Sequence, residues 1–122
     1  MTNALRILIL EDDAIIGMHL AELLAAMGHE ICAIEITEAD AVAAARHHRP
    51  DLMIVDARLQ VGSGISAVES ICRHRYVPHV FITGDIVGVR ATVPAAIVLE
   101  KPFRESLLAR AIQQAVSATA TR

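Results

Sequence analysis

The chain has 122 residues, the usual size of one domain, and its 11 Lys and Arg against 14 Asp and Glu give a net charge of −3 at pH 7. A hydrophobic fraction of 54% and a mean hydropathy of +0.47 exclude a disordered chain, and a pI of about 6.0 disfavours direct nucleic-acid binding. No apolar run reaches the roughly 20 residues of a membrane span, and the N-terminus lacks a signal-peptide pattern, so we expect a cytoplasmic protein without membrane insertion.

Five short apolar segments are predicted to be strands. They are rich in Ile, Leu and Val at consecutive positions, which is typical of strands that are buried on both faces of a parallel sheet. These segments cover residues 6–10, 31–36, 52–55, 80–82 and 97–99.

Longer segments between and after these strands are predicted to be helices, because their apolar residues recur at helical spacing. They cover residues 14–27, 38–48, 65–72 and 104–117. Gly28 is expected to end the first helix, and Thr37 to cap the second. Residues 85–94 contain β-branched residues, Gly88 and Pro94, which are poor helix formers, so we expect a short, distorted or mobile fourth helix. The alternation predicts an α/β fold, a (βα)5 parallel sheet covered on both faces.

Reactive side chains follow four of the five predicted strands, at the edge where parallel α/β sheets place their ligands. They are Glu11, Asp12 and Asp13 after the first strand, Asp56 after the third, Thr83 after the fourth and Lys101 after the fifth. Converging carboxylates repel one another, so a bound cation is the natural compensation, and oxygen-only ligands favour Mg²⁺. Together with the hydroxyl and the ammonium group, they predict a pocket for a phosphoryl group.

The alternative interpretation is that each acidic residue only caps the helix that follows it. For any single residue this interpretation is the simpler one. It does not explain why four strand ends all carry reactive groups, so we favour a site.

The apolar strands and the reactive residues at their ends, taken in chain order, resemble the receiver domain of two-component response regulators. The resemblance covers essentially the whole chain and rests on residues 7–13 and 51–56, Gly64, residues 83–84 and residues 101–103. It implies a flavodoxin-like, doubly wound sheet with strand order 2-1-3-4-5, and a cis bond between Lys101 and Pro102. The chain ends about one helix after Lys101, so we expect residues 1–122 to form a single receiver domain with no output domain.

The resemblance implies a metal site at the first and third strand ends. Asp12 would bind Mg²⁺ directly, and Glu11 would hold the ion largely through water. Asp56 and the backbone carbonyl of Arg58 would complete the protein's share of the metal ligands. Asp13 falls one position past the metal pair, so we interpret it as a helix cap or as a support for the ligands.

Asp56 is the implied phosphoacceptor, whose carboxylate attacks the phosphoryl group on a histidine kinase or a histidine phosphotransfer protein. Thr83 would bond one phosphoryl oxygen, and Lys101 would neutralise another. Arg58 and Asp85, each two residues past a site residue, stand at positions that flank the path of the attacking water in the family. Their opposite charges would either pair across the mouth of the site and hinder this water, or both side chains would point into solvent. The protein would then be no classical enzyme, but a phosphorelay module or phosphate sink that acts in trans on an unknown downstream protein and loses its phosphoryl group by autodephosphorylation.

Three positions depart from the patterns of the family and of one of its branches. Val98 stands where the family usually has an aromatic residue, three before the lysine, that moves inward on phosphorylation. Residues 78–84 are similar to a branch of stand-alone receivers known by a Phe-Ala-Thr-Gly-Tyr signature, although Ile82 and Asp85 replace its alanine and its tyrosine.

Two other classes of function use similar residues. Enzymes of the haloacid-dehalogenase type also have an aspartate at a strand end, but they need a second Asp two residues later, where this chain has Arg58. A receiver-like protein-binding module that works without phosphorylation is the other alternative, and Val98 is compatible with it. The complete set of acidic residues, Thr83 and Lys101 favours the phosphorylated module.

Overall fold

The computed structural model describes residues 3–120; residues 1–2 and 121–122, at the two ends of the predicted domain, lie outside this range. Within it, five strands alternate with five helices. The strands are β1 (Arg6–Leu10), β2 (Glu30–Glu35), β3 (Leu52–Asp56), β4 (His79–Thr83) and β5 (Val98–Glu100). The helices are α1 (Ala14–Ala26), α2 (Glu38–His48), α3 (Gly64–His74), α4 (Ile86–Thr92) and α5 (Glu105–Ala120).

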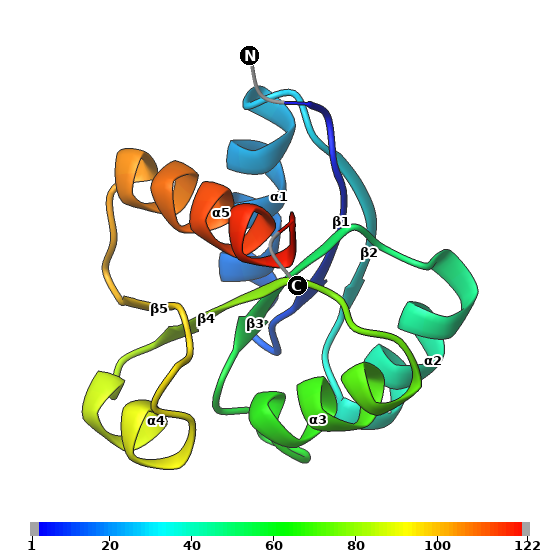
Figure 1. Ribbon diagram of the computed structural model, residues 1–122, viewed down its shortest axis with the longest axis vertical. Coiled ribbons are helices and arrows are strands. Elements are labelled where there is room, and N and C mark those ends of the chain that lie inside the picture. The colour runs from blue at the N-terminus through cyan, green and yellow to red at the C-terminus, as the bar shows by residue number, and fades with distance from the viewer. Residues whose placement is uncertain (1–2, 121–122) are drawn as a thin grey trace.

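All five strands are parallel and form one sheet in the order β2-β1-β3-β4-β5. This order confirms the predicted flavodoxin-like, doubly wound α/β fold. Helices α1 and α5 cover one face of the sheet, and α2 and α3 lie side by side on the other (Figure 1). Every predicted strand and helix exists, with ends that differ from the prediction by a few residues at most.

The central strands are buried on both faces. In β1, Leu8 and Leu10 pack toward α2 and α3, whereas Ile7 and Ile9 pack toward α1 and α5. Successive side chains of a strand point to opposite faces, so a sheet covered on both sides needs an apolar residue at each position. This arrangement accounts for the continuous apolar runs in the sequence, and all four of these β1 side chains are at most 2% exposed.

Helix ends follow the local signals. The side chain of Thr37 accepts a hydrogen bond from the backbone N–H of Asp40 and caps α2, as predicted. Gly28 adopts a φ of 96° directly after α1. Helix α4 has only seven residues, which confirms a short fourth helix; its mobility stays a prediction. No helix within residues 3–120 has both the length and the apolar character needed to cross a membrane.

Gly64, at the start of α3, is packed against the end of β3. A Cβ atom at this position would overlap the backbone carbonyl of Asp56 and would lie 2.8 Å from Cγ1 of Val55. Both neighbours belong to the central strand, so neither can move away without displacing the sheet. The glycine therefore sets how closely α3 approaches the strand that carries Asp56.

Gly64→Ala is expected to lower the free energy of unfolding by about 1–3 kcal/mol, the usual cost of forcing an extra carbon into a packed site. Gly84→Ala is the matched control, because nothing lies within 4 Å of a Cβ built at Gly84. Urea denaturation of both variants measures the difference. Equal stabilities would show that α3 can shift away from β3 at little cost.

Candidate functional site

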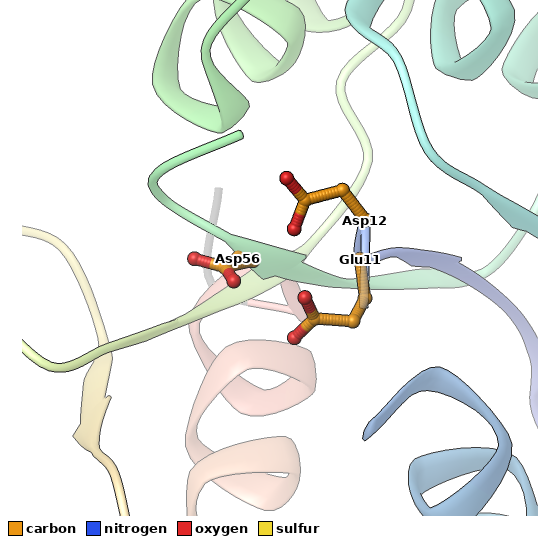
Figure 2. Close-up of side chains that lie close together, drawn as sticks. All are labelled: Glu11, Asp12 and Asp56. Carbon is orange, nitrogen blue, oxygen red and sulfur yellow. The ribbon is translucent and has the colours of Figure 1, made fainter. Parts of the chain in front are cut away.

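Three carboxylates meet at the carboxyl edge of the sheet. Glu11 and Asp12 follow β1, and Asp56 is the last residue of β3, the parallel neighbour of β1. One oxygen of each carboxylate lies within 4.8 Å of the others. Figure 2 shows the three side chains extending from the two strand ends into the same space. The topology thus brings together all three side chains predicted to bind a metal.

Lys101 reaches this cluster from the end of β5. Its Nζ donates a hydrogen bond to Oδ2 of Asp56 at 2.9 Å and another to Oε1 of Glu11 at 3.2 Å. The backbone N–H of Lys101 donates to the carbonyl oxygen of Thr83 at 2.8 Å, so the ends of β4 and β5 remain paired. The bond from Lys101 to Pro102 is cis, as predicted. One ammonium group therefore serves two carboxylates from two different strands.

Burial determines the electrostatics of the cluster. The side chain of Glu11 is 1% exposed, and its desolvation raises the pKa of the carboxyl to about 7. The backbone N–H of Asp13, 3.1 Å from Oε2 of Glu11, lowers this pKa, and the charge of Asp56 raises it. Burial alone would lower the pKa of Lys101, but Asp56 and Glu11 raise it above its ordinary value. The cluster has more negative groups than one lysine neutralises, which favours an added cation.

The loop after β3 is tied to two of the carboxylates by backbone hydrogen bonds. Oδ1 of Asp56 accepts from the N–H of Arg58 at 3.0 Å, and Oδ2 of Asp12 accepts from the N–H of Gln60 at 2.7 Å. The position of this loop therefore depends on the same acidic groups that would bind a metal.

Glu38 anchors the far end of this loop, a role that the sequence analysis did not assign. Its Oε1 accepts from the N–H of Ser63 at 3.1 Å, and its Oε2 accepts from the hydroxyl of Ser66 at 2.8 Å. These partners lie 25 and 28 residues away in the sequence, so no local motif reveals the contact. Ser63 in turn caps α3.

Thr83 is the last residue of β4 and is buried at the same edge. Its Oγ1 accepts a hydrogen bond from the backbone N–H of Asp85 at 2.9 Å, which leaves the hydroxyl hydrogen free to donate. A hollow of about 290 Å³ opens here between the loop after β3 and the start of α4, lined by Thr83, Arg58 and Asp85 among others. Thr83 is the residue of this hollow that is predicted to contact a phosphoryl group.

The predicted pair of Arg58 and Asp85 is present at the rim of this hollow. Nη2 of Arg58 lies 3.8 Å from Oδ2 of Asp85, and the two side chains are 84% and 55% exposed. Oδ1 of Asp85 also accepts from the N–H of Gly88 and caps α4. Asp13 caps α1 in the same manner, accepting from the N–H groups of Ile15 and Ile16, so the interpretation as a helix cap is confirmed.

Known proteins resemble the chain in both sequence and structure. The family model of the response regulator receiver domain matches residues 7–113. The transcriptional regulatory protein PdtaR of Mycobacterium tuberculosis (strain H37Rv) is 40% identical over 116 residues, which cover 92% of this chain and 57% of that protein. The phyllosphere-induced regulator PhyR of Methylorubrum extorquens is 34% identical over 119 residues, covering 93% and 44%. The chain thus spans about half the length of these curated relatives.

Solved structures agree with this likeness. The PhyR receiver domain of Erythrobacter litoralis superposes with a TM-score of 0.86 at 32% identity, covering 94% of this chain and 92% of that one. The response regulator PhyR of Brucella abortus gives a TM-score of 0.85 at 29% identity, covering 98% and 50%. With the fold, the strand order and the family model in agreement, the chain belongs to the family of response regulator receiver domains.

Proposed function

We propose that this protein is a phosphorelay signalling module that accepts a phosphoryl group on Asp56 from a histidine kinase or a histidine phosphotransfer protein. The observation that carries the proposal is the carboxylate of Asp56, buried at the carboxyl edge with the ammonium of Lys101 2.9 Å away and two acidic neighbours beside it. Membership of the receiver family, whose members are signalling modules rather than classical enzymes, supports it.

The donor set at the edge fits Mg²⁺. The cluster contains oxygen ligands only, and three carboxylates with one lysine leave an excess of negative charge. We propose that Asp12, Asp56 and the backbone carbonyl of Arg58 would bind the ion and that Glu11 would hold it largely through water. Bound Mg²⁺ would neutralise charge on the carboxylates and on the incoming phosphoryl oxygens.

The side chains of this protein would divide the remaining work. An oxygen of Asp56 attacks phosphorus and forms an O–P bond, while the P–N bond to the partner's histidine breaks and the imidazole leaves with its electron pair. Lys101, already bonded to Asp56, would pair with a phosphoryl oxygen. The free hydroxyl hydrogen of Thr83 would donate to another. The phosphorylated domain would then act by binding a downstream protein.

Asp56→Asn is expected to abolish phosphorylation by acetyl phosphate in the presence of Mg²⁺, because an amide oxygen is a poor nucleophile. Intact mass spectrometry measures the added phosphoryl group. Asp85→Asn is the control, since it removes a carboxylate near the site that is no phosphoacceptor, and it should still be phosphorylated. Phosphate on the Asp56 variant would place the acceptor elsewhere, and no phosphate on the wild type would favour the phosphorylation-independent binding module.

Asp12→Asn is expected to weaken Mg²⁺ binding by at least tenfold, because the amide removes one charge from a site that prefers carboxylate ligands. Isothermal titration calorimetry of the unphosphorylated protein measures the affinity. Asp13→Asn removes the same charge one position later and keeps the helix cap, since Asn caps as well as Asp. If the two variants bind Mg²⁺ equally, Asp12 is no metal ligand.

Arg58→Ala and Asp85→Ala are each expected to speed the loss of phosphate from Asp56, because the pair partly covers the hollow beside Thr83. An exposed ion pair contributes only ~0–1 kcal/mol, so each rate should rise by at most about fivefold. Mass spectrometry after removal of the phosphodonor measures the rates. The double variant should be no faster than either single one; additive effects would mean that the two residues act independently.

A further inference from the structure

A second cavity lies at the opposite edge of the sheet from Asp56. It sits between the carboxyl-terminal ends of α2 and α3, two helices that lie side by side in Figure 1, and has a volume of about 210 Å³. Its apolar lining consists of Val42, Ala45, Ile71 and Val77. Because α2 and α3 lead into the amino ends of β3 and β4, this cavity is separate from the carboxylate cluster.

Basic side chains surround the apolar floor. Arg46, Arg49, His74 and Arg75 line the cavity, and no acidic residue of the described chain does so. Arg75 donates a hydrogen bond to the carbonyl of Pro50 at 3.0 Å. Within residues 3–120, no ion pair or hydrogen bond joins the guanidinium group of Arg46 or Arg49 to another group. A protein with a net charge of −3 thus has a local excess of positive charge here.

Helix polarity favours the positive charges of this arrangement, but it does not explain the backbone conformation of Arg49. Cations are favourable at helix carboxyl termini, and the last turn of α2 already contains Arg46, His47 and His48. Arg49 caps α2 with a φ of 49°, the left-handed conformation for which glycine is the usual residue. A non-glycine residue in this conformation costs about 1–2 kcal/mol. A guanidinium group at this position therefore suggests a role for the side chain itself.

The cavity continues into a groove between α2 and α3. This groove has a volume of about 950 Å³ and shares Val42, Arg46 and His74 with the cavity. Its other end is lined by Val61 and Gly62, in the loop that follows Asp56, and by Glu38, whose two carboxylate oxygens are already hydrogen-bonded to Ser63 and Ser66. The side chain of Val61 is exposed there. An elongated groove of this kind fits an extended segment better than a compact small molecule.

We propose that this α2–α3 groove binds an acidic, extended segment of a partner protein. One apolar side chain of the segment enters the cavity, and its carboxylates pair with Arg46, Arg49 and Arg75. An apolar cavity of about 150 Å³ holds a molecule the size of benzene, and drug-sized ligands need about 300 Å³ or more. A cavity of about 210 Å³ therefore accommodates one aromatic or branched aliphatic side chain. The basic rim gives the interaction its charge selectivity.

Peptide selection tests this proposal without knowledge of the partner. A phage library of random short peptides is selected on the wild-type protein and counter-selected on the Arg46→Gln/Arg49→Gly double variant. Arg49→Gly is suited to this purpose because glycine fits the φ of 49°, so the variant should be at least as stable as the wild type. Peptides with Asp or Glu next to Leu, Ile or Phe are expected to be enriched.

Binding of a synthetic enriched peptide is then measured by calorimetry and mapped by amide chemical shifts. Arg49→Gly is expected to weaken it by about five- to tenfold, the loss of one partly exposed charge-assisted hydrogen bond. Arg110→Gln, which removes a charge from α5, should leave the affinity unchanged. The shifts should fall on α2 and α3. Enrichment without acidic residues, equal affinity for Arg49→Gly, or shifts confined to α4 and α5 would each overturn the proposal.

Discussion

The two hydrogen bonds of the Lys101 ammonium group, to Asp56 and to Glu11, are the interaction on which the carboxyl edge of this protein depends. They join the end of β5 to the ends of β3 and β1, across β4, which lies between β3 and β5 in the sheet. The same burial that makes these bonds strong also raises the pKa of Glu11 to about 7. The single ammonium group holds this edge together but neutralises only part of its negative charge. A bound cation or a phosphoryl group would therefore change the net charge of the cluster.

The fold makes this arrangement possible because the apolar core residues and the charged site residues occupy different parts of the strands. From Ile7 to Leu10 in β1 and from Leu52 to Val55 in β3, every side chain is apolar and buried between two helical layers. The carboxylates lie at or directly after the strand ends, where backbone N–H groups of the following residues donate hydrogen bonds to them. The loop after β3 is positioned by those bonds at one end, through Asp12 and Asp56, and by Glu38 at the other.

The two edges of the sheet also differ in charge. The carboxyl edge carries the cluster of Glu11, Asp12 and Asp56, whereas the ends of α2 and α3 at the amino edge carry arginines and histidines. The groove between α2 and α3 connects the two, because its far end is formed by Val61 and Gly62. The loop after Asp56 therefore belongs both to the carboxyl edge and to the groove. A conformational change of this loop and the binding of a segment in the groove would involve the same residues.

The sequence by itself determined the α/β class, the extent of each element and the identity of the acidic cluster. These features depend on local signals: continuous apolar runs, helical spacing, caps such as Thr37, and reactive residues directly after strands. The resemblance to receivers added the strand order and the pair of Arg58 and Asp85, both of which the structure contains. Only the tertiary structure decided the anchoring of the loop by Glu38 and the bond from Gln60 to Asp12, because these partners lie 25 to 48 residues apart. It also decided the left-handed conformation of Arg49 and the cavity beside it, since both arise where the ends of two helices pack against each other and no single segment encodes that contact.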